Sequence, residues 1–178
     1  ARLSAPQPAD FPRGAPAIAG HPWNELRNYA GMPATGPLSP ELIDELRHGY
    51  LACISYLDAQ VGRVLAELER LDLARDTIVV FWSDHGFHLG EHALWGKTTN
   101  FELDTRTPLL IAAPGVGRPG TRVTGLVELL DLYPTVADLA GLPLPAGLEG
   151  TSLVPWLREP ARPGKAAARS QHPHPSYG

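Results

Sequence analysis

Hydrophobic positions recur every three to four residues over SPELIDELRHGYLACISYLDAQVGRVLAELERL (39–71), and this spacing predicts a long amphipathic helix. Ser39 suits the N-cap and Pro40 suits the first helical position. Gly49 and Gly62 weaken the pattern locally, and a helix of this length allows a kink there. One apolar face is formed by Leu42, Leu46, Tyr50, Ile54, Leu57, Val61, Leu65 and Leu68.

Two later runs, TIVVFWS (77–83) and TPLLIAAPG (107–115), are almost continuously apolar. Runs of this kind are typical of strands that are buried on both faces in a parallel sheet. RVTGLVE (122–128) predicts a weaker third strand, and DLYPTVADLAG (131–141) predicts a helix that ends before Gly141. This order of helices and strands favours the α/β class.

Composition excludes several classes of protein. The chain has 178 residues and a net charge of −4, and it shows no basic stripe, so we expect no nucleic-acid partner. The longest uncharged apolar run (107–117) is too short and too broken by proline and glycine to span a membrane. Cys53 is the single cysteine, which excludes an internal disulfide framework.

Proline is concentrated at the two ends of the chain. Of the 19 prolines, eight lie in 1–40 and seven in 141–178. Proline restricts the backbone and removes an N–H donor, so both ends are predicted to be irregular and the middle to hold the regular structure.

The run SDHGFHLGEHALWGK (83–97) follows the first predicted strand and gathers acidic residues, three histidines and a lysine. In open α/β sheets, ligands bind at the carboxyl ends of the strands, so this position favours a site. Asp84 and His85 could give an oxygen and a nitrogen to one metal ion. The run could equally be a polar turn with solvated histidines.

A second metal hypothesis places His85, His88 and His92 on one face of a helix, where they would bind zinc. Gly86 and Gly90 count against a regular helix, because glycine favours tight turns.

Several phrases in this order resemble the sulfatase family of the alkaline-phosphatase-like superfamily. SDHG, GEH and WGK occur at fixed spacing and are followed by a Thr-Pro-Leu strand. The Asp-His pair and YLACISYLDAQVG are similar to the iduronate-2-sulfatase-like branch. The other matching phrases are GYLACISYLDAQVGRVLAEL (49–68), VELLDLYPTVADLAGLPLP (127–145), LEGTSLVPWL (148–157) and SQHPHP (170–175).

The resemblance implies a fold and a domain organisation. The fold would be part of an alkaline-phosphatase-like three-layer sandwich with a mostly parallel central sheet. Residues 39–157 would form the middle-to-C-terminal part of the catalytic domain. Residues 1–38 would precede it as a Pro-rich irregular segment, and 158–178 would follow as a Pro-rich tail leading to a further C-terminal part.

The resemblance also implies roles for residues of the loop. Asp84 and His85 would be ligands of one divalent cation, usually calcium. Lys97 would be catalytic, its ammonium contacting the oxygens of the transferred sulfate. Glu91 and His92 would line the substrate pocket or brace the loop. No role is implied for His88, and local ion pairs are expected for Glu102, Asp104 and Arg106.

The family's nucleophile is formylglycine, made from a cysteine or serine in a Cys-x-Pro-x-Arg type motif. Cys53, in ACISYL, lacks that proline and arginine, and its place in the helix pattern predicts a packing residue. The family's early aspartate pair is also absent. We therefore expect the nucleophile and half of the metal site to precede Ala1. The chain alone should show no turnover and little metal affinity.

Three functions follow from these patterns. The first is a sulfuric ester hydrolase, acting on a sulfate ester that could be a sulfated saccharide. The second is a phosphatase or phosphonate-ester hydrolase of the same superfamily. The third is a non-catalytic remnant that binds a partner or a sulfated glycan. The resemblance also implies export to the periplasm, the extracellular space or the lysosome.

Overall fold

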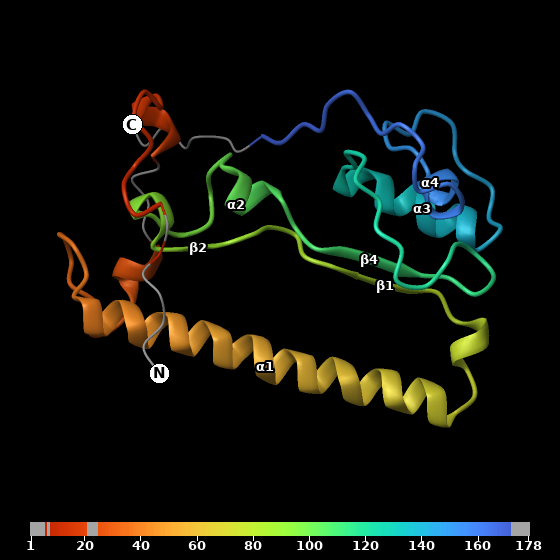
Figure 1. Ribbon diagram of the computed structural model, residues 1–178, viewed down its shortest axis with the longest axis horizontal. Helices are drawn as coiled ribbons and strands as arrows, with labels where there is room; N and C mark the ends of the chain where they lie inside the picture. The colour runs from red at the N-terminus through yellow and green to blue at the C-terminus, as the bar shows by residue number, and fades with distance from the viewer. Residues whose placement is uncertain (1–5, 7, 21–24, 172–178) are drawn as a thin grey trace. The chain divides into compact units, whose positions relative to one another are not determined.

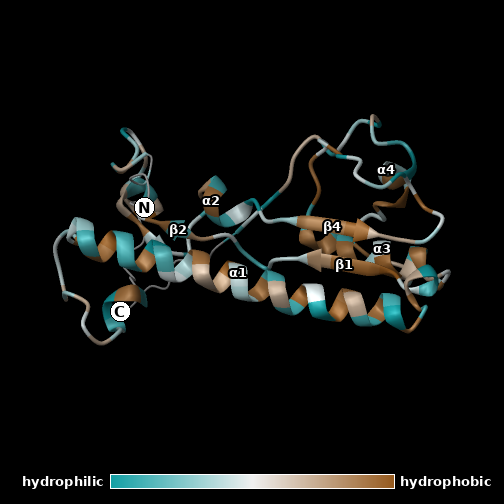
Figure 2. Ribbon diagram, turned by 60° about the horizontal axis from the view of Figure 1, so that its bottom comes forward, coloured by the Kyte–Doolittle hydropathy of each residue, from teal (hydrophilic) through white to brown (hydrophobic). Residues whose placement is uncertain are grey.

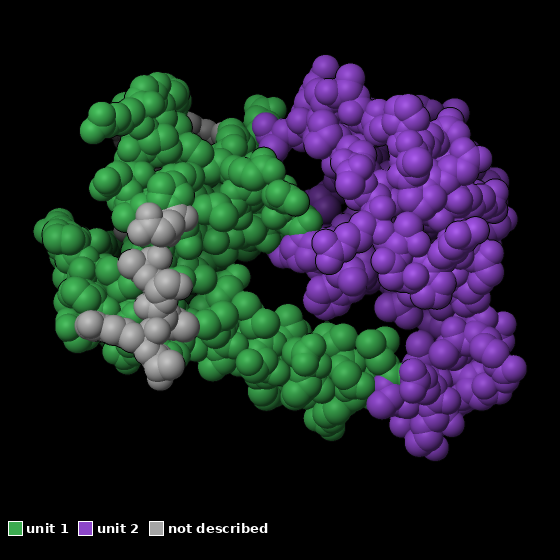
Figure 3. Space-filling model, viewed as in Figure 1, with its two compact units in different colours: residues 1–65, 85–107, 171–178 green, residues 66–84, 108–170 purple. Residues whose placement is uncertain are grey.

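The computed structural model describes residue 6 and residues 8–20 and 25–171 (Figure 1). The chain divides into two compact units (Figure 3). The first unit comprises 1–65, 85–107 and 171–178, and the second comprises 66–84 and 108–170.

The helices are α1 (Pro40–Arg70), α2 (Glu102–Thr105), α3 (Leu132–Leu139) and α4 (Val154–Arg158). The strands are β1 (Val79–Trp82), β2 (His88–Leu89), β3 (Trp95–Gly96) and β4 (Leu109–Ala112). Short 3-10 helices cover Ala17–Ala19 (η1), Glu25–Asn28 (η2), Ala74–Asp76 (η3), Glu91–Ala93 (η4) and Leu129–Asp131 (η5).

The long helix α1 agrees closely with the prediction for 39–71. Ser39 caps it, since the backbone N–H of Leu42 donates to Ser39 Oγ over 3.2 Å. Figure 2 shows hydrophobic and hydrophilic residues alternating along the helix. No α1 residue is buried in the described chain, and Cys53 is exposed, so the expectation that it packs is wrong here.

The strands β1 and β4 occur where the two apolar runs predicted them, but they pair antiparallel. A parallel pair needs a crossover, usually a helix. The connection from 83 to 108 holds the short strands β2 and β3, the 3-10 helix η4 and the four-residue helix α2, and none of these is a crossover helix. The mostly parallel sheet expected for this chain is therefore not what its described strands form.

The prediction that these strands are buried on both faces is also wrong. Phe81 is 38% exposed, Trp82 46% and Leu110 59%, although both strands are hydrophobic (Figure 2). A ribbon of two strands provides too little neighbouring structure to cover both of its faces.

The third predicted strand, 122–128, does not form. Its only strand-like contact among the described residues is an isolated bridge between Leu126 and Lys165. The backbones of Gly125 and Gly164 pass so closely that a Cβ on Gly125 would lie 2.9 Å from Gly164 Cα. This close crossing fixes the position of residues 122–128, but it does not add a strand to a sheet.

The predicted helix at 131–141 is confirmed as α3, preceded by η5 and followed by Gly141 at a φ of 67°. Its first turn is fixed by Asp131, which is fully buried. The Asp131 carboxylate accepts hydrogen bonds from the backbone N–H of Glu128 over 2.9 Å and of Thr151 over 2.8 Å. Lys165 Nζ donates to the same carboxylate over 2.8 Å and also pairs with Glu128.

Buried apolar residues are few. In the second unit they lie on or beside α3 and α4: Pro134, Ala137, Leu153 and Val154. Thr135 is fully buried among them, and its Oγ1 donates to the Asp131 carbonyl and accepts from the Leu153 N–H. Within the described part of the chain, no helix has both the length and the apolar character that a membrane crossing requires. Most of the SQHPHP phrase lies outside the described residues.

Candidate functional site

The loop that follows β1 is not helical where the zinc hypothesis needed a helix. Residues 84–87 have no regular structure, His88 lies in β2, and His92 lies in η4. Among the residues that the structure describes, no group of three or more His, Cys, Asp or Glu side chains could hold a metal ion. The spacing-based zinc face therefore does not form.

The hairpin of β2 and β3 is held by a buried histidine-aspartate pair. His88 is 0% exposed and Asp104 5%. His88 Nδ1 donates to Asp104 Oδ1 over 2.8 Å, because a carboxylate can only accept. Asp104 Oδ2 accepts from the Thr99 N–H over 2.8 Å and from Thr99 Oγ1 over 2.5 Å. The Asp104 carboxylate thus links the C-terminal end of the segment 88–104 to its N-terminal end at His88 and to Thr99.

The ionisation of Asp104 follows from these contacts. Burial acts to raise the pKa of the carboxyl, but the hydrogen bonds from His88 and Thr99 outweigh burial and hold the pKa below its usual value. Asp104 is therefore a carboxylate at neutral pH, and His88 is a structural donor rather than a solvated side chain.

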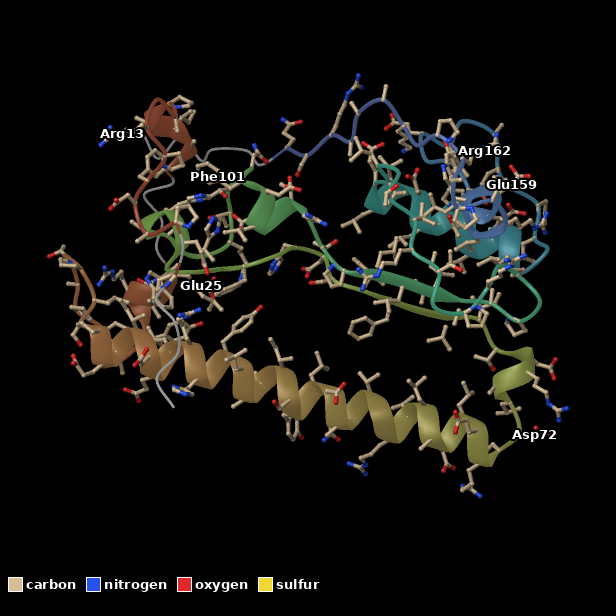
Figure 4. All side chains as sticks on the ribbon, viewed as in Figure 1. Arg13, Glu25, Asp72, Phe101, Glu159 and Arg162 are labelled. Atoms are coloured by element: carbon tan, nitrogen blue, oxygen red, sulfur yellow. The ribbon has the colours of Figure 1, made fainter. Side chains whose placement is uncertain are left out.

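An aromatic cluster surrounds this pair. The rings of His88 and His92 have centroids 5.6 Å apart, and the His92 and Phe101 centroids are 4.7 Å apart. Phe101, which is labelled in Figure 4, also meets Phe11 edge-on, with ring centroids 5.9 Å apart. His88 Nε2 and His92 Nδ1 are buried without a hydrogen-bond partner among the described residues. The cluster joins the N-terminal segment to the loop.

Two glycines shape the loop for different reasons. Gly90 has a φ of 104°, which is the left-handed region that glycine favours. Gly86 donates its N–H to the Asp104 carbonyl over 2.7 Å, and a Cβ at Gly86 would lie 1.8 Å from the Leu103 carbonyl oxygen. The tight turn expected at Gly86 is therefore a close backbone crossing.

The predicted metal ligands lie directly after β1. Asp84 is exposed and His85 is half-buried. His85 Nδ1 donates to the Gly86 carbonyl over 2.8 Å, so in the neutral ring Nε2 carries the lone pair that a metal would need. Calcium takes about six to eight oxygen ligands. These two residues alone do not make such a site, and the described chain adds no third ligand of the required type.

Glu91 and His92, predicted to line a pocket or brace the loop, both make contacts within the first unit. Glu91 Oε2 accepts the N–H of Leu89 over 2.6 Å. The His92 backbone N–H donates to the Pro8 carbonyl over 2.6 Å, and its ring belongs to the aromatic cluster. These contacts brace the loop, and a role in binding substrate stays a prediction.

Lys97 directly follows β3, and the residues on either side of it have positive φ. Gly96 has a φ of 102° and Thr98 a φ of 91°. A positive φ is rare for a β-branched residue and is held only where the surroundings impose it. Of the four non-glycine residues described with positive φ, three lie within residues 92–98 (His92, Ala93 and Thr98), and the fourth is Asp72.

The partner of Lys97 comes from a distant part of the sequence. Lys97 Nζ donates to Glu25 Oε2 over 3.0 Å, and Glu25 belongs to η2, which packs beside β3. The side chains of Lys97 and Glu25 are 32% and 43% exposed. Neither this pair nor the His88–Asp104 pair was found from the sequence. Of the residues expected to form local ion pairs, Arg106 and Glu102 do so, at 3.9 Å. The expectation is wrong for Asp104, which pairs with His88, 16 residues away.

Comparison with known proteins identifies the family. Residues 5–142 match the Sulfatase family model. The chain is 34% identical to iduronate 2-sulfatase from Homo sapiens over 222 residues, which covers 97% of this chain and 40% of that protein. The chain belongs to the sulfatase family, as the sequence resemblance predicted.

Solved structures agree with this assignment. The phosphonate monoester hydrolase from Silicibacter pomeroyi has a TM-score of 0.69 and 36% identity, covering 79% of this chain and 27% of that one. A protein solved with its substrate D-glucosamine-2-N,6-O-disulfate has a TM-score of 0.67 and 32% identity, covering 73% and 26%. The chain thus has mixed helix and strand structure of the alkaline-phosphatase-like kind, and it spans less than half the length of these relatives.

Proposed function

We propose that the protein to which this chain belongs is a sulfuric ester hydrolase and that the loop 83–97 forms part of its active site. The observation that carries this proposal is the position of Lys97. Its ammonium lies at the end of a strained loop in a chain of the sulfatase family, and it already holds a carboxylate oxygen at 3.0 Å. A group placed in this way is suited to the anionic oxygens of a sulfate ester.

Lys97 would act on the transition state. As the bond from sulfur to the ester oxygen breaks, negative charge develops on the oxygens of the sulfuryl group and on the leaving oxygen. A fixed ammonium stabilises that charge without the reorganisation that water would need. We propose that Glu91 and His92 help to keep this loop in place and line its substrate side.

We further propose that Asp84 and His85 contribute to a divalent cation site, with calcium as the ion that family resemblance favours. The Asp84 carboxylate is the hard oxygen ligand that calcium prefers. The other ligands and the formylglycine nucleophile would come from parts of the protein outside this chain. When bound, the cation would hold the sulfate group in place.

The domain organisation proposed from the sequence fits this role. Residues 39–157 would form the middle-to-C-terminal part of the catalytic domain, between the Pro-rich segments 1–38 and 158–178. In the complete protein, β1 and β4 would join a larger, mostly parallel sheet. We propose a sulfated saccharide as the substrate class, because a related solved protein was captured with a disulfated glucosamine. Family resemblance also favours an exported enzyme.

Phosphonate or phosphate ester hydrolysis is the second candidate. It is favoured by the similarity to the phosphonate monoester hydrolase, at 36% identity. Both reactions place negative charge on oxygens beside Lys97, so the lysine alone does not distinguish them.

The test uses the complete protein with 4-nitrophenyl sulfate, 4-nitrophenyl phosphate and a 4-nitrophenyl phosphonate ester. We expect the sulfate to have the highest kcat/KM. Lys97→Ala should lower kcat by about 10²- to 10³-fold, as does the loss of other groups that stabilise transition-state charge. Arg106→Ala, an exposed cation of the same unit, is the matched control and should retain activity. Preference for the phosphonate would select the second candidate.

A further inference from the structure

Glu25 contacts Lys97 across 72 residues of sequence, and both of its carboxylate oxygens are engaged. Oε2 accepts from Lys97 Nζ over 3.0 Å, and Oε1 accepts from the hydroxyl of Tyr29 over 3.1 Å. Figure 4 labels Glu25 among the side chains of this unit. Tyr29 thus fixes the carboxylate from one side, while Lys97 meets it from the other.

The segment that carries Glu25 is itself anchored. The guanidinium of Arg27 donates to the carbonyls of Pro33, over 2.9 Å, and Gly36, over 2.5 Å. These bonds tie η2 to the chain that leads into α1. Because η2 also packs beside β3, the carboxylate has a defined position next to the WGK phrase.

The electrostatics keep Glu25 charged. The hydrogen bond from Lys97 is the largest cause that holds the pKa of Glu25 below its usual value, followed by the hydrogen bond from Tyr29. The charge of His85 makes a smaller contribution in the same direction. The Glu25 carboxyl group that Lys97 contacts is therefore ionised at neutral pH.

The geometry explains why Lys97 needs a partner. The left-handed backbone at Gly96 and the strained backbone at Thr98 set where the side chain starts, but a lysine stem of four carbons rotates freely beyond that point. An ammonium has three N–H donors. Among the described residues, Glu25 takes one of these donors and fixes the end of the stem, which leaves two for the oxygens of an anionic ligand.

We infer that Glu25 is a positioning residue that fixes the ammonium of Lys97 for transfer of the sulfuryl group. This inference rests on the proposed function, because it assigns Lys97 to that reaction. Glu25 acts through Lys97, with Tyr29 and Arg27 holding the carboxylate in turn.

The kinetic test compares Glu25→Ala and Glu25→Gln in the complete protein with 4-nitrophenyl sulfate. We expect Glu25→Ala to lower kcat about tenfold with little change in KM, because misplaced catalytic groups chiefly reduce kcat. Glu25→Gln keeps an oxygen that can accept from Lys97 Nζ, so its loss should be smaller. Glu102→Ala removes an exposed acid of the same unit and serves as the matched control.

A double-mutant cycle separates positioning from general damage. In the Lys97→Ala background, Glu25→Ala should cause no further loss of kcat, since the group that it positions is gone. An equal loss in both backgrounds would overturn the inference. A lower KM in Glu25→Ala would also overturn it, because Glu25 would then compete with substrate for Lys97.

A second readout does not need turnover. Acylation of Lys97 by an amine-reactive ester, quantified by peptide mass spectrometry, should be several times faster in Glu25→Ala. Lys165 in the same protein is the internal reference. Faster labelling of Lys97 without any sulfate ester hydrolysis by the wild type would reject the proposed function but support the contact. Unchanged labelling would overturn the inference even in an active enzyme.

Discussion

Each compact unit contains a buried carboxylate that organises the backbone around it, and the two carboxylates differ in the side chain that pairs with them. Asp104 in the first unit and Asp131 in the second each accept a hydrogen bond from a threonine N–H over 2.8 Å. Asp104 is then paired with His88, 16 residues away, and Asp131 with Lys165, 34 residues away. One partner is the imidazole of a histidine, and the other is the ammonium of a lysine.

The two networks also differ in their surroundings. The Asp104 network holds a loop with candidate catalytic residues, whereas the Asp131 network is structural. The Asp104 network encloses the segment with Lys97 and most of the described residues with strained backbone. The Asp131 network joins η5, Thr151 and Lys165 and has no candidate catalytic group beside it. A buried acid is therefore not by itself a sign of a catalytic site, and its neighbours decide the interpretation.

The largest effect is expected at Asp131. Asp131→Ala removes the acceptor for two backbone N–H groups and leaves Lys165 with only Glu128, so we expect a loss of about 3–5 kcal/mol in the free energy of unfolding. Urea unfolding measures it, followed by tryptophan fluorescence, to which Trp82 and Trp156 of the same unit contribute. Glu149→Ala, an exposed acid of this unit, should change stability by less than about 0.5 kcal/mol. Equal effects would show that the Asp131 network does not hold this unit.

Asp104→Asn should have a smaller effect, about 2 kcal/mol, since the amide keeps the shape of the side chain but loses the charge that strengthens the bonds from His88 and Thr99. Urea unfolding followed by tryptophan fluorescence, to which Trp95 in β3 contributes, measures it. We also expect reduced activity, because the loop with Lys97 would loosen.

The control for Asp104→Asn lies on the same short helix. Glu102→Gln removes an exposed charge whose pair with Arg106 is 3.9 Å long, and such surface pairs contribute little. A loss at Glu102 equal to that at Asp104 would contradict the role given to the buried network.

The contrast between these networks also shows what the sequence could predict. The helix α1 and its cap at Ser39 follow from local spacing, and so do the positions of β1, β4 and α3. The pairing direction of the strands, their exposure and the absence of a strand at 122–128 depend on contacts between segments that local patterns do not encode.

The candidate site divides in the same way. Asp84, His85 and Lys97 were identified because their spacing follows a family phrase within one loop. Glu25 carries no such signal, because its only link to Lys97 is spatial. His88 and Asp104 were both noticed in the sequence, but nothing in the sequence indicates that the two meet in a buried pair.

The smallest expected effect is a loss of stability at low pH. It tests the Asp104 network in the wild-type protein, without any substitution. The fold holds the pKa of Asp104 below the reference value of 3.8. Its contribution to stability is therefore complete above that value and is lost as the pH falls through the lower pKa of the folded state. The N–H of Thr99, which donates to this carboxylate over 2.8 Å, should lose hydrogen-exchange protection in that range.

The same measurement on Asp104→Asn supplies the control, because an amide does not titrate. Its Thr99 N–H should show weaker protection near neutral pH and no further loss linked to residue 104 in acid. The pKa of Lys165 is shifted upward, since its bonds to Asp131 and Glu128 outweigh the opposing effect of burial. The charge of Lys165 therefore persists throughout the acid range and is lost only in strong alkali. If the Thr99 N–H lost protection equally in the wild type and in Asp104→Asn, the acid dependence would belong to another group, and the buried carboxylate would not be what holds the Lys97 loop.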